Sequence, residues 1–258
     1  METYRTVFCH ISSYGNLYNA FQKAQKGKRQ KDYVIEFESN LDNNLRQLKY
    51  ELEDFTYHPS PLKEFIVRDP KTRKIGASNF RDRVVYHAIC NIIAPIFEKR
   101  FIHDSFANQV NKGTHKAVKR AEKFIQKFIV QHAVGGVGVT LREFRSKCIG
   151  YAFKADIRHY FDTVDHEILL EILKEKIKDP DAIWLVKLIL SNHKTEIKGK
   201  GMPLGNLTSQ FFANVYLDKL DQYIKHELKI KYYIRYVDDF VIFHKDKAII
   251  EAWKKQIG

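Results

Sequence analysis

Two adjacent aspartates, Asp238 and Asp239, interrupt an otherwise apolar segment that reads YYIRYVDDFVIF at residues 232–243. The β-rich runs on both sides predict a hairpin with the acids at its tip. A third acid, Asp156, ends the strand-like run YAFKAD at residues 151–156. Each acid also has an ordinary structural interpretation, because Asp favours turns and helix N-caps.

Carboxylates that gather within a few ångströms repel one another, so they either become protonated or bind cations. Their hard oxygen atoms select Mg²⁺ or Mn²⁺. Two such ions, about 3.5–4 Å apart, can activate an attacking hydroxyl and stabilise the pyrophosphate that leaves a nucleotide. The spacing does not show that Asp156 meets Asp238, since 82 positions separate them in the chain.

The elements that must position these acids are a mixture of helices and strands. Residues 1–60 are predicted to form a charged, helical lead-in whose buried face carries Leu41, Leu45, Leu48 and Leu52. Strands are expected at 65–75, around a turn at Asp69-Pro70, at 151–157 and at 232–243. Helices are expected at 82–97, 115–128, 165–177, 180–190, 207–228 and 246–256. Because these elements do not follow a regular βαβ order, the expected fold class is α+β.

The 258 residues include 44 Lys and Arg against 31 Asp and Glu, which gives a formal net charge of +13. Residues 61–120 hold 13 basic and five acidic side chains, so much of the excess lies there. A basic face suits polyanions such as nucleic acid, although a solvated lysine-rich surface is the simpler explanation of the charge alone. Three scattered cysteines, no signal peptide and no 18-residue apolar run predict a cytoplasmic protein that does not bind membranes.

Ordered motifs over roughly residues 15–257 resemble those of reverse transcriptases. FKADIRHYFDTVDHEIL at 153–169 is similar to their first palm motif, and YVDDF at 236–240 to their Y-x-D-D hairpin. GMPLGNLTSQFFANVYLDKLD at 201–221 resembles the loop and helix that hold the incoming nucleotide and the template. FIVRDPKTRKIGASNFRDRVVYHAI at 65–89 and PIFEKRFIHDSFANQVNKGTHKAV at 95–118 resemble fingers motifs.

The central motif indicates a subgroup within this family. In group II intron and retron reverse transcriptases it usually reads Q-G-x-x-x-S-P. Here Leu204 precedes Gly205, and Gln210 follows Ser209. This form, like the charged lead-in, resembles the reverse transcriptases of diversity-generating retroelements.

The resemblance implies a right-hand polymerase fold with fingers and palm. We expect a helical lead-in at 1–60, fingers at 61–149 and 166–205, and a palm at 150–165 and 206–258. The family continues with a further palm strand, a primer grip and a helical thumb. Because the chain ends at Gly258, we expect the thumb to be missing, which puts the activity of this chain alone in doubt.

For the acids, the resemblance implies that Asp156, Asp238 and Asp239 hold two Mg²⁺ ions, with Mn²⁺ as an alternative. The backbone carbonyl of Ile157 is expected as an additional ligand. The primer 3′-hydroxyl would then attack the α-phosphate in line, so that catalysis consists of positioning and charge neutralisation.

Arg68 and Arg73 match the fingers cations that grip the triphosphate, because a guanidinium fork fixes its orientation on phosphate oxygens. The alternative is that they are exposed charges on a hairpin. Phe161 matches the aromatic gate that excludes a 2′-hydroxyl, or else fills the core.

The remaining site residues come from the central motif and the hairpin. Leu204 and Gly205 are expected beside the nucleotide, where glycine permits close approach of the backbone. Contacts with template and primer are expected from Ser209, Gln210 and Tyr236, although Gln210 fits a plain helix start equally well.

The expected activity is RNA-directed DNA synthesis, with template RNA, a primer or cDNA strand and deoxynucleoside triphosphates as partners. Leu204 lacks the amide that would check nucleotide geometry, so we expect an error-prone enzyme. The resemblance also implies a small basic accessory protein. The alternatives are a retron, group II intron or defence-associated reverse transcriptase, or a non-catalytic RNA-binding relative.

Overall fold

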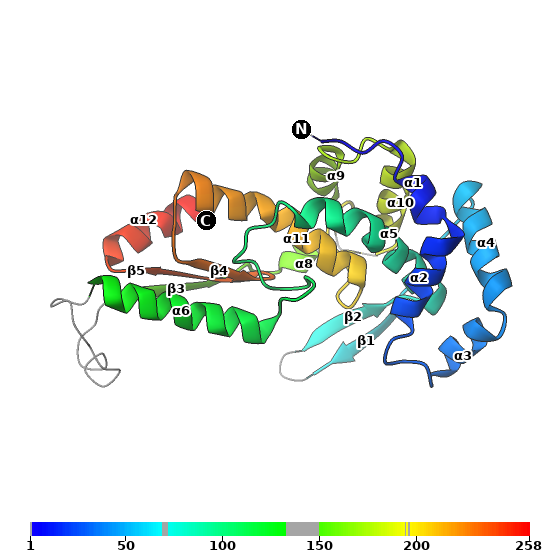
Figure 1. Ribbon diagram of the computed structural model, residues 1–258, viewed down its shortest axis with the longest axis horizontal. Helices are drawn as coiled ribbons and strands as arrows, with labels where there is room; N and C mark the ends of the chain where they lie inside the picture. Colours follow the sequence, from blue (N-terminus) through cyan, green and yellow to red (C-terminus); the bar gives the residue numbers. More distant parts are fainter. Residues whose placement is uncertain (1, 69–71, 133–149, 194, 196) are drawn as a thin grey trace. The chain divides into compact units, whose positions relative to one another are not determined.

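The computed structural model describes residues 2–68, 72–132, 150–193, 195 and 197–258 (Figure 1). The chain divides into two compact units. The first unit comprises Met1–Arg100 and His159–Tyr216, and the second comprises Phe101–Arg158 and Leu217–Gly258. The turn predicted at Asp69-Pro70 lies outside the described residues.

The first unit is mainly helical. Its hairpin pairs β1 (Lys63–Val67) with β2 (Arg73–Ala77), so that Val67 lies opposite Arg73. Its helices are α1 (Phe8–Ser12), α2 (Tyr14–Ala24), α3 (Asp32–Ser39), α4 (Leu41–Glu53), α5 (Phe80–Glu98), α8 (Tyr160–Thr163), α9 (His166–Lys174), α10 (Pro180–Ser191) and the first part of α11 (Leu207–Gln222).

Side-chain caps and apolar faces explain why these helices form. Asp165 and Asp179 accept hydrogen bonds from backbone N–H groups in the first turns of α9 and α10, which satisfies donors that a helix leaves free. On α4, the apolar face predicted from leucine spacing is confirmed, because Leu45, Leu48 and Leu52 are fully buried.

The second unit is built on a three-stranded antiparallel sheet with the strand order β3-β5-β4. The strands are β3 (Tyr151–Asp156), β4 (Tyr233–Tyr236) and β5 (Asp239–His244). Among its described residues, the other elements of this unit are α6 (Thr114–His132), the end of α11, the π-helix η1 (Tyr223–Glu227) and α12 (Lys247–Ile257).

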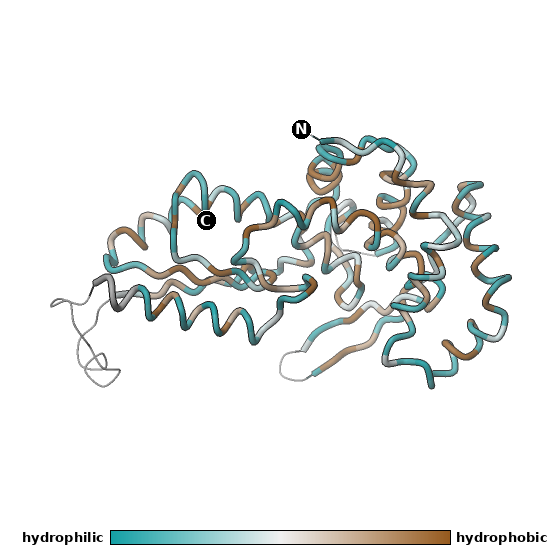
Figure 2. The backbone as a smooth tube through the Cα atoms, viewed as in Figure 1, coloured by the Kyte–Doolittle hydropathy of each residue, from teal (hydrophilic) through white to brown (hydrophobic). Residues whose placement is uncertain are grey.

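Helices cover both faces of this sheet (Figure 1). Phe124 of α6 packs with Tyr232, Ile234 and Phe106 on one face. The opposite face carries Phe240 and Ile242, which pack with residues of η1 and α12. Hydrophilic and hydrophobic residues alternate along α6, as expected for a helix with one face on a core (Figure 2).

The predicted elements are present as helices and strands near their predicted positions, which confirms the α+β class. The helix expected at 207–228 ends at Gln222 and continues as a π-helical turn. The compact units group residues 101–132 with the sheet, so their limits differ from those expected for fingers and palm, which stay a prediction. Among the described residues, no helix combines the length and the hydrophobicity needed to cross a membrane.

Candidate active site

Asp156 and Asp239 are direct neighbours across the sheet of the second unit. They are Cα partners in the antiparallel pairing of β3 with β5, at the end of both strands. Directly opposed residues point to the same face, with Cβ atoms about 4.5–5.5 Å apart. Pairing across the sheet thus joins two acids that the sequence separates.

Asp238 lies in the tight loop between β4 and β5. Tyr236 pairs with Asp239, so Val237 and Asp238 form a two-residue hairpin loop. Val237 has a φ of 55°, at the first loop position, which glycine usually takes in a type II′ turn. A β-branched residue rarely adopts this conformation, so the backbone is strained beside the acids.

The face that carries these acids is open along β3 and covered along β4. Lys154 and Asp156 are exposed on β3, whereas Ile234 of β4, on the same face, is buried. Lys154 Nζ lies 3.7 Å from Asp239 Oδ1, but both side chains are at least half exposed, so the pair contributes little to stability. The Tyr236 hydroxyl accepts a hydrogen bond from Thr114 Oγ1 at 3.1 Å.

The donor set suits a hard divalent cation, because three carboxylates and the backbone of Ile157 lie at one end of one sheet. In the described part of the chain, however, no three His, Cys, Asp or Glu side chains are gathered closely enough to hold a metal ion. For all three Asp side chains to share an ion, they would therefore have to move closer to one another.

A buried network of hydrogen bonds supports the Val237-Asp238 loop, and the sequence did not predict it. The Arg235 guanidinium donates to both carboxylate oxygens of Asp221, at 2.8 and 2.6 Å, and to the carbonyl of Val237 at 2.8 Å. The Tyr233 hydroxyl also donates to Asp221, at 2.6 Å. Burial and the Asp221 charge raise the pKa of Tyr233 well above its ordinary value, so the phenol stays protonated as a donor. The signal in the sequence was an arginine inside an apolar strand.

In the first unit, Arg68 and Arg73 lie at the same end of the β1–β2 hairpin. Arg73 begins β2, Arg68 directly follows β1, and both side chains are exposed. The two cations are thus available to a ligand at the hairpin end.

Leu204 and Gly205 dock against β2. The Gly76 N–H donates to the carbonyl of Leu204 at 3.1 Å. Gly205 has a φ of +102°, and a Cβ there would lie 2.9 Å from Ile75 Cγ2. Glycine is therefore required by its own conformation and by the hairpin, whether or not a nucleotide approaches it.

Two of the remaining predicted residues are partly accessible and one is buried. Phe161 is half-buried, and its ring packs edge-on against Tyr160 with centroids 5.3 Å apart. Ser209 lies in the first turn of α11 and is only 3% exposed, so its side chain is buried in this unit. Gln210 is half-buried and lines a cavity of about 360 Å³ together with Lys28, Arg83 and Gly205.

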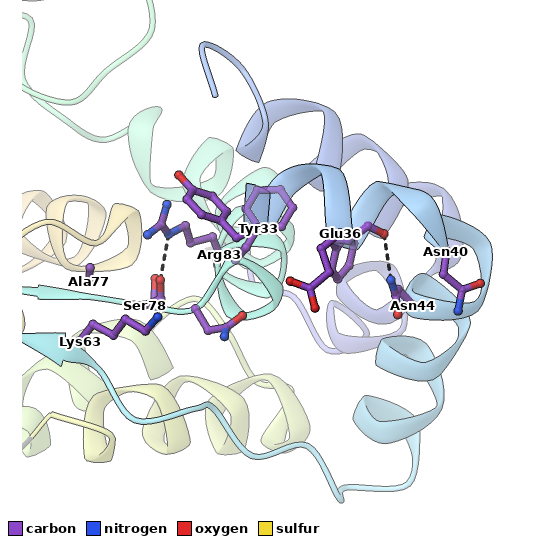
Figure 3. Close-up of a pocket in the computed structure, with 11 residues that line it drawn as sticks. Tyr33, Glu36, Asn40, Asn44, Lys63, Ala77, Ser78 and Arg83 are labelled. Carbon is purple, nitrogen blue, oxygen red and sulfur yellow. Dashed lines mark hydrogen bonds between the residues drawn. The ribbon is translucent and has the colours of Figure 1, made fainter. Parts of the chain in front are cut away.

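A separate cavity of about 470 Å³ lies between α3, the β1–β2 hairpin and the start of α5 (Figure 3). Arg83 and Tyr33 lie at one side of it, and the Arg83 Nε donates to the carbonyl of Ser78 at 3.0 Å (Figure 3). Glu36 and Lys63 add opposite charges to the lining. None of the predicted site residues lines this cavity.

Comparison with known protein families gives a match to the model described as reverse transcriptase (RNA-dependent DNA polymerase), over residues 67–257. The Group II intron-encoded protein LtrA of Lactococcus lactis subsp. cremoris is 25% identical over 232 residues, which is 85% of this chain and 34% of that protein. Protein YkfC of Escherichia coli is 24% identical over 259 residues, covering 85% of this chain and 64% of that protein. The chain thus spans between about a third and two thirds of these relatives.

Solved structures share the fold at lower identity. A chain of a partial Cas6-RT-Cas1–Cas2 complex superposes with a TM-score of 0.54 at 19% identity, covering 97% of this chain and 42% of that chain. An apo telomerase from Candida tropicalis gives a TM-score of 0.52 at 12% identity, covering 80% of this chain and 49% of that chain.

Proposed function

Because this chain belongs to the reverse transcriptase (RNA-dependent DNA polymerase) family, we propose that it extends a primer 3′-hydroxyl with deoxynucleotides on an RNA template. The observation that carries the proposal is the pairing of Asp156 with Asp239, beside the loop that holds Asp238. A right-hand polymerase needs carboxylates at one place to neutralise charge that develops on the reacting phosphate.

Asp156, Asp238 and Asp239 would hold two Mg²⁺ or Mn²⁺ ions, with the Ile157 carbonyl as an additional ligand. When bound, the ions would lower the barrier by stabilising the attacking and leaving oxygens. The aspartates place negative charge at the end of the sheet. Lys154, which lies beside Asp239, would be displaced from that carboxylate by an ion.

The residues of the first unit would bind the incoming nucleotide. Arg68 and Arg73 are free to bind triphosphate oxygens through their guanidinium groups. Phe161 would exclude the 2′-hydroxyl, and Leu204 and Gly205 would contact the nucleotide. For the template and primer we propose Gln210 and Tyr236 as direct contacts, with Ser209 acting through the helix start because it is buried.

We propose that the enzyme is error-prone and serves a diversity-generating retroelement, with a small basic accessory protein as a partner. The sequence Leu204-Gly205 with Ser209-Gln210 supports this subgroup. A second candidate is a group II intron enzyme, which is favoured by the relative named as a group II intron-encoded protein. The DNA that flanks the gene separates them, because a template and variable repeat pair supports the first and an intron supports the second.

Primer extension on an RNA template tests the activity directly. With Mg²⁺ and deoxynucleotides, the protein should lengthen an annealed DNA primer, and Asp238→Asn should lower the rate by about two orders of magnitude or more. The amide keeps the size of the side chain and removes the charge that holds a cation. RNA affinity and the unfolding midpoint should change little, since phosphate contacts come from basic side chains.

Asp246→Asn is the matched control. Asp246 caps α12 in the same unit, and asparagine caps helices as well as aspartate. Its extension rate should equal that of the wild type. Near-wild-type extension by Asp238→Asn would end the catalytic assignment.

A further inference from the structure

We propose that Arg235 is a positioning residue that, clamped by Asp221, fixes the Val237-Asp238 loop in the strained conformation that presents the acids. This inference rests on the proposed function, because it concerns how the same site is kept in shape. Arg235 touches neither substrate nor the reacting atoms; it would act through the backbone of Val237.

The guanidinium is held in one orientation. Its side chain and that of Asp221 are both 0% exposed, and their contact is bidentate, with nitrogen–oxygen distances of 2.8 and 2.6 Å. A planar fork with two parallel bonds to a carboxylate has little freedom to turn. The remaining nitrogen, Nη1, is thereby aimed at the Val237 carbonyl, 2.8 Å away.

The backbone of Arg235 is fixed as well. Its N–H donates to the carbonyl of Asp104 at 3.0 Å, and its carbonyl accepts from the Phe106 N–H at 3.0 Å. On the other side, β4 pairs with β5, where Arg235 lies opposite Phe240. The segment around Ser105 thus pairs with the edge of β4 that β5 leaves unpaired. Hydrogen bonds on both sides therefore fix the backbone of Arg235 next to the loop.

The loop needs such support, because Val237 has a φ of 55°. A left-handed conformation is unfavourable for a non-glycine residue, and more so for a β-branched one, so the loop favours relaxation. Relaxation would turn the Val237 carbonyl and move the following residue, Asp238. The hydrogen bond from Arg235 opposes that rotation at the peptide that joins Val237 to Asp238.

A purely structural role explains this arrangement less well. The surrounding sheet face is apolar, with Ile224, Phe240 and Ile242 in its core. A buried ion pair there adds little net stability over well-packed apolar residues, because both charges lose their hydration. Unlike apolar side chains, the ion pair supplies a hydrogen-bond donor that points at the Val237 carbonyl.

Arg235→Lys tests this, because lysine keeps the charge but cannot bond Asp221 and the Val237 carbonyl together in the same geometry. The turnover rate of primer extension should fall by about tenfold or more, while KM for deoxynucleotide stays within about twofold. Amide hydrogen exchange at residues 236–239 should become faster, which is a readout independent of activity.

Rescue by glycine distinguishes positioning from packing. Val237→Gly removes the strain, so in the Arg235→Lys background it should restore most of the missing turnover. Val237→Ala is the matched control: it also shortens the side chain but keeps the Cβ that causes the strain, and it should not rescue. Equal turnover of both double variants would overturn the proposal, as would unchanged turnover in Arg235→Lys.

If Arg235→Lys does not fold, Tyr233→Phe takes its place, since it removes one hydrogen bond to Asp221 and leaves the ion pair. The turnover rate should then fall by about two- to fivefold, again with rescue by Val237→Gly and not by Val237→Ala. If the wild type shows no extension at all, the proposed function fails for this chain on its own. The exchange rates at 236–239 still decide the clamp, because unchanged exchange in Arg235→Lys or Tyr233→Phe refutes it.

Discussion

Leu204 places an apolar side chain at the loop before α11, at the position that glutamine takes in the Q-G-x-x-x-S-P motif. The side chain lines a cavity of about 530 Å³ whose other residues include the polar His159, Asp162 and Thr163. Leucine has no polar group that could hydrogen-bond a correctly placed nucleotide, so it does not penalise a misplaced one. A decrease of about 1.4 kcal/mol in the free-energy difference between correct and wrong nucleotides is a tenfold change in selectivity.

Leu204→Gln should therefore lower misincorporation by up to about tenfold without abolishing synthesis. Sequencing cDNA from the two proteins measures the error rates. Leu204→Met is the control, because it changes the side chain without adding an amide, and it should leave the error rate unchanged. Equal error rates in Leu204→Gln and the wild type would mean that Leu204 only packs the loop.

At the scale of single residues, the sequence could predict which side chains carry the chemistry but not how they are supported. Asp156 and Asp239 stand out as acids at the ends of apolar runs, yet only the strand pairing joins them. Arg235 and Asp221 lie 14 positions apart on different elements, and no local pattern links them. The burial of Ser209 also depends on tertiary packing, which hydrophobic periodicity does not describe.

At the scale of elements, Asp104 joins three parts of the second unit. It accepts from Arg120 of α6 at 2.7 Å and from Lys225 of η1 at 3.2 Å, and its backbone carbonyl accepts from β4. Burial alone would raise the pKa of Asp104, but hydrogen bonds from Arg120 and His103 and the charge of Lys225 hold it below its ordinary value. For Lys225, the loss of hydration on burial outweighs the attraction of Asp104, so the pKa of Lys225 is lowered. The lowered pKa of Asp104 prevails, because Arg120 and Lys225 both place a positive charge beside its carboxylate.

Asp104→Asn should lower the free energy of unfolding by about 2 kcal/mol at pH 7, because two partly buried cations lose their counter-charge. Urea unfolding measures the difference. Since the folded-state pKa of Asp104 lies below the unfolded value, its contribution is complete above about pH 4 and is lost as the pH falls through the folded value. The difference between the two proteins should therefore shrink below about pH 4, and a difference that persists there would contradict the pairing.

Helices and strands were predictable where one periodic pattern decides them. Ala117, Ala121 and Phe124 recur at helical spacing on α6, and all three pack against the sheet. The end of α11 was less predictable, because the π-helical turn at Tyr223–Glu227 has no distinct spacing in the sequence. Strand order was beyond the sequence, since β3 pairs with β5 across more than 80 positions.

At the scale of the whole molecule, the net charge of +13 predicts salt-sensitive binding to nucleic acid. Within the second unit, α6 packs on the sheet face that carries Phe243, and alternation along β5 places Asp239 on that face too. Exposed lysines at positions 116, 119 and 123 of α6 lie at helical spacing near this face. The lysines of α12 belong to a helix that packs on the opposite face.

Replacing Lys116, Lys119 and Lys123 together by glutamine should weaken RNA binding and make it less dependent on salt. Each phosphate that the protein no longer neutralises lowers the magnitude of the slope of log K against log salt concentration by about 0.7–0.9, so three phosphates amount to about 2–3. The matched control replaces three exposed lysines of α12, Lys247, Lys254 and Lys255, and removes the same charge from the other side of the sheet. Affinity titrations from about 50 to 200 mM salt measure both slopes. Equal slopes for the two triple variants would mean that RNA affinity depends on the net charge alone. It would then not depend on lysines near the face that carries the acids.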